Sequence, residues 1–407
     1  MKTYFFSILV RGFIAASGFL VFLVSAKLFG ADGRGVISYG TSIFATFGLF
    51  FSLNLGRTFV GKTSQNESLK KDFIFTFMLL NIGAIILTSL LGYCFWNFSL
   101  SAHEHLSAHM LIPFLATSIF YVWNVNGNLF FASFQRTHEQ EIIILITRFA
   151  LVSFLILFTV IDVKNLFYFI CFYSLILSLG SVSEFILLLR IVGRKHHFPN
   201  WKNLKTILQE TIWPHLDFLS FNLYPLLLVL IAGKYLETAK IGRINFAIQI
   251  INLIFLLSTT ANIRVNAYVS NFGFRTKLEQ IKKLFWWTFF VSTVASLLAL
   301  LVLSQLSTTS YLGSFDGVAT LFGIAIFSIP GYMAYQFLNP ILLEMKRIKE
   351  SAYINLFNSF IVIILSPFLI EFYNEIGSMV LFALFHIGLL FGQYFVFLRY
   401  IKNVTEN

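Results

Sequence analysis

Four ionisable side chains lie inside long apolar stretches of this sequence: Arg11, Arg148, Glu184 and Asp217. A charge at the centre of a lipid bilayer costs at least about 2.5–3.5 kcal/mol, so it usually faces a cavity or a partner. In such a setting an arginine can hold an anion, and a carboxylate can take up and release a proton. The alternative is that both arginines snorkel to the membrane interface and that the carboxylates only pair with them.

The stretch around Asp217 favours the first interpretation. At a spacing of i, i+4, i+7 and i+11, one helix face there carries Trp213, Asp217, Ser220 and Tyr224. The next apolar stretch continues with a polar stripe of Asn245, Gln249, Asn252 and Thr259. We expect these two faces to line a hydrated cavity between two lobes. The alternative is that small residues and amides only pack between helices.

Further amides and aromatic side chains lie in two other apolar stretches. One holds Asn124, Asn126 and Asn128, and the other holds Tyr332, Tyr335 and Asn339. Such groups contact sugars, and they also join helices. We place Asn124 and Asn128 among the cavity-facing residues.

Enzymatic and metal-binding motifs are not apparent in the sequence. The histidines at 103, 105 and 109 match no standard metal-site spacing, so neither a metal nor another cofactor is expected. No nucleophile stands beside a base, and no phosphate-binding glycine loop opens a soluble helix. We therefore do not expect an enzyme.

Composition predicts the elements that carry these residues. Apolar residues make up 57% of the 407 positions and charged residues 12%, with a mean hydropathy of +0.81. A soluble domain has roughly twice that share of charge. The apolar stretches are about 20 residues long and continuous, as in spanning helices, whereas barrel strands would alternate. We therefore predict an all-α membrane protein with twelve spans, at residues 5–29, 36–56, 73–97, 110–134, 142–161, 166–190, 211–232, 244–263, 284–305, 317–340, 352–371 and 377–399.

The lysines and arginines predict the orientation of these helices. With the N-terminus in the cytoplasm, 21 of the 29 basic residues fall on the cytoplasmic side and six on the other, namely Lys27, Arg34, Lys164, Lys234, Lys240 and Arg243. Both termini are then cytoplasmic, and each of the four buried charges lies roughly 10 Å from the cytoplasmic end of its span. The net charge of +11 is accordingly an orientation signal and a contact for anionic lipids, and nucleic-acid binding is not expected.

A glycine-rich segment at residues 27–39 returns 207 positions later. Lys27 falls on Lys234, Gly35 on Gly242 and, further on, Arg57 on Arg264. Three matches at one offset, each placed alike beside an apolar stretch, predict two similar six-helix lobes, residues 1–192 and 211–407, joined by a cytoplasmic linker at 193–210. We expect Gly30, Gly33 and Gly35 to adopt the positive φ angles of a tight turn outside the membrane.

The same segment, KLFGADGRGVISY, resembles the R-x-L-G-P-x-x-x-G-x-Y turn of Wzx-type polysaccharide or O-antigen flippases. These belong to the multidrug/oligosaccharidyl-lipid/polysaccharide (MOP) exporter superfamily. Six plus six spans and an arginine in span 1 fit as well, although Lys27 replaces the usual arginine and the proline is missing. The resemblance implies a two-lobe transporter of the bacterial inner membrane. It would turn over undecaprenyl-pyrophosphate-linked oligosaccharide repeat units by alternating access, for O-antigen or capsule synthesis.

For such a cargo, the chemistry of the residues above predicts their roles. Arg11 and Arg148 would bind the pyrophosphate, with Arg57 and Arg264 as collecting charges at the cytoplasmic mouth. Asp217, and less directly Glu184, would couple proton or cation movement to loading, because protonating both leaves a net charge of +2 beside the pyrophosphate. The sugars would face hydroxyls and amides of Ser220, Tyr224, Asn245, Gln249, Asn252, Asn124 and Asn128. Expected partners are the lipid-linked oligosaccharide, membrane lipids, and the polymerase and chain-length regulator of the same pathway.

Three other functions compete with this interpretation. A MATE-like drug or cation antiporter would need an acidic, aromatic cavity, which two buried arginines disfavour. A flippase for the lipid-linked peptidoglycan precursor usually has two further spans. A polyprenyl-dependent membrane enzyme of polysaccharide assembly usually has a large outside loop or an acidic metal motif.

Overall fold

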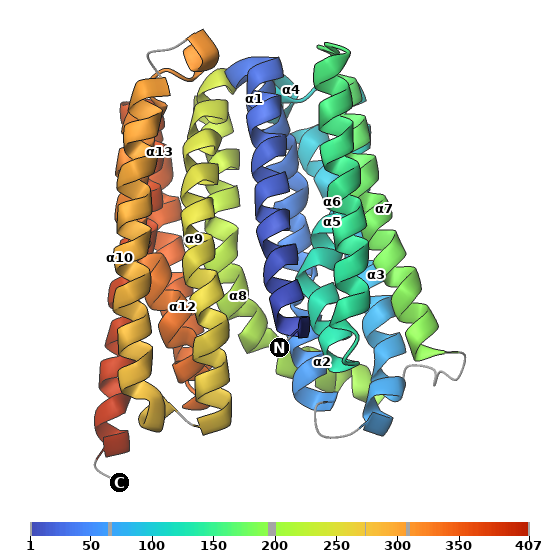
Figure 1. Ribbon diagram of the computed structural model, residues 1–407, viewed down its shortest axis with the longest axis vertical. Coiled ribbons are helices and arrows are strands. Elements are labelled where there is room, and N and C mark those ends of the chain that lie inside the picture. The colour runs from blue at the N-terminus through green and yellow to red at the C-terminus, as the bar shows by residue number, and fades with distance from the viewer. Residues whose placement is uncertain (1, 64–66, 194–200, 273, 307–309, 406–407) are drawn as a thin grey trace. The chain divides into compact units, whose positions relative to one another are not determined.

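A computed structural model describes residues 2–63, 67–193, 201–272, 274–306 and 310–405 of the chain. Among these residues there is no strand, and almost every one is helical (Figure 1). The helices are α1 (Lys2–Phe51), α2 (Leu55–Thr63), α3 (Glu67–Phe98), α4 (Leu100–His105), α5 (Ala108–Ser133), α6 (Thr137–Val160), α7 (Leu166–Val192), α8 (Trp201–Tyr235), α9 (Thr238–Phe272), α10 (Phe274–Leu306), η1 (Ser310–Phe315), α11 (Val318–Ala325), η2 (Ile326–Ser328), α12 (Ile329–Glu344) and α13 (Ile348–Thr405).

Ten of the described helical segments are long and apolar enough to cross a membrane. Two of them, Gly12–Val60 and Ile348–Tyr400, run over 49 and 53 residues. At about 1.5 Å per residue each is more than twice as long as the ~30 Å hydrocarbon core is thick. Each contains a residue with non-helical backbone angles, Gly30 in α1 and Asn374 in α13. The protein is therefore an all-α, multi-pass membrane protein, while the twelve-span count and the cytoplasmic termini stay predictions.

The segment at residues 27–39 is a sharp break in a helix. Gly30 has φ 64° and ψ −164°, angles that are essentially restricted to glycine. The expectation that Gly33 and Gly35 also have positive φ is wrong, because both continue the helix after this single break. Glu237, which the 207-position offset relates to Gly30, lies at the break between α8 and α9.

Arg34, which the charge pattern places on the side opposite the cytoplasm, is buried within the protein. Its side chain is only 6% exposed. The guanidinium donates to the Ser25 hydroxyl at 3.1 Å and lies over the ring of Phe22, 4.6 Å from its centroid. Both contacts reach back across the break at Gly30, so Arg34 ties the second part of α1 to the first. A charge that can join two helical segments in this way need not lie in a loop.

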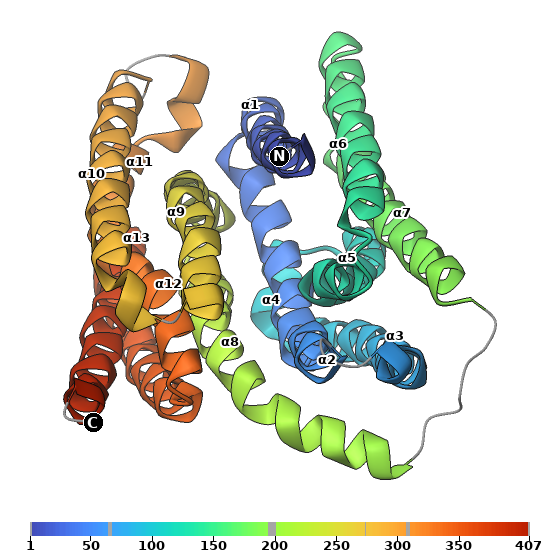
Figure 2. The same cartoon turned by 60° about the horizontal axis from the view of Figure 1, so that its bottom comes forward.

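The helices form two compact units, Met1–His215 and Leu216–Asn407. In the first unit α5 packs against α1, α2, α3 and α7, and α1 packs against α6 (Figure 2). In the second unit α12 packs against α9, α10 and α13. The boundary lies within α8, beyond the predicted linker at 193–210, because the first part of α8 packs on the first unit.

A buried apolar cluster explains why the start of α8 belongs to the first unit. It joins α2, α3, α5, α7 and α8 through Leu55, Phe59, Ile74, Phe77, Met78, Trp123, Phe130, Phe131, Leu188, Val192 and Ile207. Ile207 of α8 is completely buried there. Burying such a side chain stabilises the packed state by about 1.5–3 kcal/mol.

Replacing Gly30 with alanine should lower the free energy of unfolding by about 1–3 kcal/mol, because a Cβ is strained at these backbone angles. The matched control is Gly18→Ala in the same helix, where an added Cβ meets nothing within 4 Å. That change should be neutral or stabilising by up to about 1 kcal/mol. Thermal unfolding of the two purified variants measures the difference, and equal melting temperatures would contradict it.

Candidate functional site

Asp217 of α8 is completely buried in the second unit, and its carboxylate accepts four hydrogen bonds. Oδ2 accepts from the Tyr335 hydroxyl at 2.9 Å and the Asn339 amide at 2.7 Å, both on α12. Oδ1 accepts from the Ser351 hydroxyl at 2.8 Å and the Asn355 amide at 3.2 Å, both on α13. An ionised carboxylate has about four acceptor positions, so these donors suit the charged form of Asp217.

Gln393 extends this network on α13. Its amide donates to the Ser351 hydroxyl oxygen and to Asn355 Oδ1, each at 2.8 Å. Ser351 and Asn355 are four residues apart, as are Tyr335 and Asn339, so each pair lies on one helix face. The i, i+4 spacing of polar residues inside an apolar stretch is therefore the sequence signal that could have identified the partners of Asp217.

Glu184 of α7 is the buried carboxylate of the first unit, with 8% of its surface exposed. Its Oε2 atom accepts from Trp123 Nε1 at 3.0 Å and from the Gln140 amide at 2.6 Å. Arg148 of α6 is half-buried and interacts electrostatically with Glu184 and with Tyr173. The charge of Arg148 thus acts on Glu184, which is the pairing that the sequence analysis gave as its alternative, while the carboxylate's hydrogen bonds come from neutral donors.

Arg34 is a candidate that the sequence analysis missed. Tyr173 of α7 interacts electrostatically with both Arg34 and Arg148. The first unit thus holds two arginines within its apolar helices, close to one tyrosine. The glycines on either side of Arg34 are typical of a loop, and only the packing across the Gly30 break shows that this side chain is buried.

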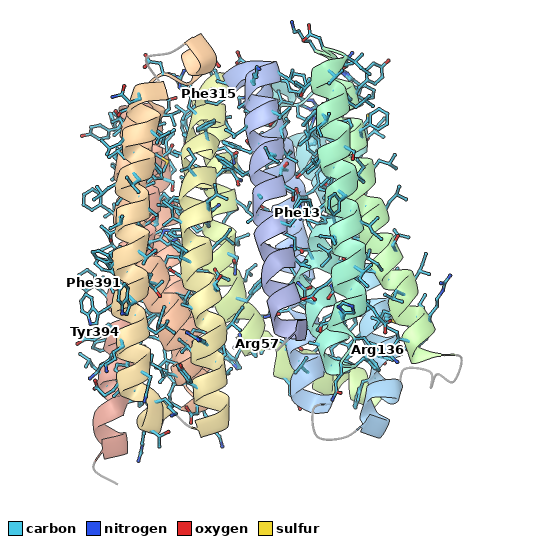
Figure 3. All side chains as sticks on the ribbon, viewed as in Figure 1. Phe13, Arg57, Arg136, Phe315, Phe391 and Tyr394 are labelled. Carbon is cyan, nitrogen blue, oxygen red and sulfur yellow. The ribbon has the colours of Figure 1, made fainter. Side chains whose placement is uncertain are left out.

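The remaining predicted arginines have different surroundings. Arg57 of α2 is half-buried, and Arg264 of α9 is exposed. Figure 3 shows Arg57 and Arg136 at the same end of the first unit. This arrangement fits the prediction that both face one side of the membrane. The side chain of Arg11 lies outside the described part of the structure.

The predicted sugar-facing residues divide into two groups. Ser220 and Tyr224 are buried within the second unit, where the Ser220 hydroxyl donates to the Asp217 carbonyl and Tyr224 stacks on Phe385 at 4.5 Å. Asn245 is also buried. Four amides lie on the surface of α5 and α9, namely Asn124, Asn128, Gln249 and Asn252. Within the described ranges no three His, Cys, Asp or Glu side chains gather as metal ligands.

The two buried carboxylates should respond differently to neutralisation. Both hydrogen bonds to Glu184 reach one oxygen, so glutamine can keep them. The four bonds to Asp217 use both oxygens, so in Asp217→Asn an amide NH₂ must face other donors, at a cost of about 1–3 kcal/mol per unsatisfied group. Asp217→Asn should therefore lower the melting temperature of the purified protein clearly, and Glu184→Gln only slightly. The opposite order would show that these contacts do not govern stability.

Comparison with known proteins shows which solved structures share this fold. No protein-family profile matches the sequence, and a search of curated proteins finds no match. Among solved structures, the chain is similar to the lipid II flippase MurJ in an inward closed conformation, with a TM-score of 0.71 and 16% identity over 97% of this chain and 87% of the other. It is also similar to an inward-facing MATE multidrug transporter of the MOP superfamily (TM-score 0.61, 11% identity, 97% and 95% covered) and to the eukaryotic MATE transporter AtDTX14 (0.59, 13%, 98% and 95%). The chain therefore has the fold of MOP-superfamily flippases and exporters.

Proposed function

We propose that this protein is a flippase for undecaprenyl-pyrophosphate-linked oligosaccharide repeat units. It would move them from the cytoplasmic to the periplasmic leaflet of the bacterial inner membrane by alternating access, for O-antigen or capsular polysaccharide synthesis. The fold supports a transporter of the MOP type. The polymerase and chain-length regulator of the same pathway are the protein partners that this function implies.

The observation that carries the proposal is the pair of arginines, Arg34 and Arg148, inside the apolar helices of the first unit. Holding a guanidinium among apolar side chains is costly unless a partner offsets the charge, so it indicates a function. Arginine binds phosphate oxygens in a bidentate way, and an anionic pyrophosphate would stabilise both charges. In this proposal Arg11 and Arg148 bind the pyrophosphate, Arg34 adds to the positive potential around Tyr173, and Arg57 and Arg264 collect the cargo at the cytoplasmic side.

The polar side chains then have two roles. The exposed amides Asn124, Asn128, Gln249 and Asn252 contact the sugars, as the sequence analysis expects. Asp217 and Glu184 couple transport to a proton or cation gradient, without a bound cofactor. When Asp217 takes up a proton, the hydroxyl of Tyr335 or of Ser351 must change from hydrogen-bond donor to acceptor. Protonation of Asp217 therefore changes the contacts between α8, α12 and α13.

A MATE-like drug or cation antiporter is the second candidate. The buried carboxylates Glu184 and Asp217, one in each unit among the described residues, favour it, as does the similarity to MATE structures. The hydrogen bonds to both carboxylates come from neutral side chains of the same unit, which satisfies them without a cationic cargo. We therefore rank this candidate below the flippase.

The flippase proposal predicts where the cargo accumulates. In a deletion strain, undecaprenyl-pyrophosphate-linked repeat unit should be made and stay on the cytoplasmic leaflet, inaccessible to a membrane-impermeant reagent added outside spheroplasts. Wild-type protein should restore access. Arg148→Ala should not, and Arg148→Lys should do so partly, because lysine keeps the charge and loses the bidentate geometry.

Arg136→Ala is the matched control, since Arg136 precedes α6 and is exposed. It should restore access fully. If the repeat unit reaches the outer leaflet in the deletion strain, the protein acts after translocation and the flippase proposal is wrong. Export of a cationic dye by the wild-type protein, abolished by Asp217→Asn, would favour the antiporter instead.

Coupling is tested separately in proteoliposomes. With a pH gradient imposed, flipping by the wild-type protein should accelerate. The variants Asp217→Asn and Glu184→Gln, where they reach the membrane, should still bind cargo but should accelerate less when the gradient is applied. The exposed carboxylate Glu237 provides the control, because Glu237→Gln neutralises a charge outside the buried networks. Unchanged gradient dependence in both buried variants would refute coupling at these residues.

A further inference from the structure

The corner between α1 and α2 is a helix break held inside the protein. α1 ends at Phe51 and α2 begins at Leu55, and between them Leu53 and Asn54 adopt positive φ angles of 52° and 46°. Ser52 and Leu55 are completely buried. A helix end leaves backbone N–H and C=O groups without helical partners, and in a buried place other groups of the protein must satisfy them.

Asn126 of α5 satisfies both sides of this corner. Its side chain is completely buried. Oδ1 accepts from the Gly56 N–H at 2.9 Å, and Nδ2 donates to the Ser52 carbonyl at 3.0 Å and to Asn81 Oδ1 at 2.9 Å. Asn81 in turn donates to the Phe77 carbonyl at 2.8 Å, which orients its amide. A carboxamide is the side-chain group that can replace one backbone donor and one backbone acceptor at the same time.

The first part of α8 holds the corner from another side. Nε2 of His215 donates to the Phe50 carbonyl at 3.0 Å, and the hydroxyls of Thr211 and Thr58 are hydrogen-bonded at 2.9 Å. These residues lie in the first unit. The hydrogen bonds from α5 and α8 therefore involve backbone groups before, within and after the break.

Close packing also fixes how α2 lies against α5. A Cβ at Gly56 would meet the Asn126 carbonyl oxygen at 2.7 Å and Leu129 Cβ at 2.8 Å. Phe59 is completely buried and packs edge-on against Phe77 and Phe130 at 5.1 and 5.4 Å. With Gly56 against α5 and Phe59 in the apolar cluster, α2 can neither rotate nor withdraw freely.

Arg57 stands between these two fixed positions, in the first turn of α2, and is half-buried at one end of the unit (Figure 3). We propose that Asn126 is a positioning residue for Arg57: it closes the α1–α2 corner and so sets the direction in which the guanidinium points. This inference rests on the proposed function, in which Arg57 collects the anionic headgroup of the cargo. Among the three asparagines of α5, the buried Asn126 and not the exposed pair then affects collection of the headgroup by Arg57.

The geometric part is tested without reference to transport. Arg57→Cys is placed in a background in which Cys94 and Cys171 are alanine, and its reaction rate with a charged thiol reagent is measured in inverted membrane vesicles. Asn126→Ala should change this rate several-fold, since the Gly56 N–H loses its acceptor and the Ser52 carbonyl keeps only the longer bond from the Leu55 N–H at 3.4 Å. Asn222→Ala should not, because the Asn222 amide donates only to the Phe218 carbonyl of its own helix. An unchanged rate with Asn126→Ala overturns the proposal.

Gly56→Ala provides a second variant if Asn126→Ala does not reach the membrane. This substitution leaves Asn126 in place and pushes α2 away from α5, so the labelling rate of residue 57 should change as well. If Gly56→Ala leaves the rate unchanged, close packing at the corner does not set the position of residue 57, and the proposal is overturned.

The functional part is a double-mutant cycle on flipping. Asn126→Ala alone should reduce the rate about tenfold, and in an Arg57→Ala background it should reduce it no further, because residues that act through one group are not additive. If the fold-reductions of the two single variants instead multiply in the double variant, Asn126 acts independently of Arg57 and the proposal is wrong. If Arg57→Ala leaves flipping unchanged, the assigned role of Arg57 in the proposed function fails, while the labelling rates still decide whether Asn126 positions it.

Discussion

The four hydrogen bonds to the Asp217 carboxylate connect three helices, α8, α12 and α13, at one buried point. Tyr335 and Asn339 bring α12 to it, and Ser351 and Asn355 bring α13. In a protein whose outer surface faces lipid, water cannot solvate a buried charge, so the protein must provide every donor itself. This constraint makes Asp217 a structural centre of the second unit as well as a candidate for coupling. Any event that changes its charge also changes the contacts among α8, α12 and α13.

The first unit meets the same constraint with neutral side chains, two amides and an indole. Asn126 replaces the missing backbone partners of Ser52 and Gly56, and Gln140 with Trp123 solvates Glu184. These polar groups lie between helices and have defined geometry, so they restrict which helices can be neighbours and in which rotation. Apolar packing alone would allow several arrangements of similar energy, because lipid tails are as apolar as the side chains of a helix face.

The distribution of charge bears directly on transport. Each unit holds a buried carboxylate that is hydrogen-bonded by neutral groups, and the first unit also holds Arg34 and Arg148 near Tyr173. The arginines make the first unit suited to an anionic cargo, and the carboxylates offer positions at which a proton or cation can change the local charge. A fold shared by flippases and drug exporters leaves the cargo to such residues, because a fold by itself does not determine what is bound.

The amino-acid sequence alone determined the broad character of this protein. Continuous apolar stretches predicted membrane-spanning helices, the 207-position offset related Gly30 to the break before α9, and isolated charges identified the buried Glu184 and Asp217 and the half-buried Arg148. Hydropathy and periodicity depend only on residues close together in the chain, so they can be recognised from the amino-acid sequence. Only the tertiary structure decided that Arg34 is buried, that Asn126 rather than Asn124 or Asn128 faces the interior, and which donors reach Asp217. These outcomes depend on the rotation of each helix about its axis and on partners more than a hundred residues away, as for Asp217 and Ser351, and no local pattern specifies either.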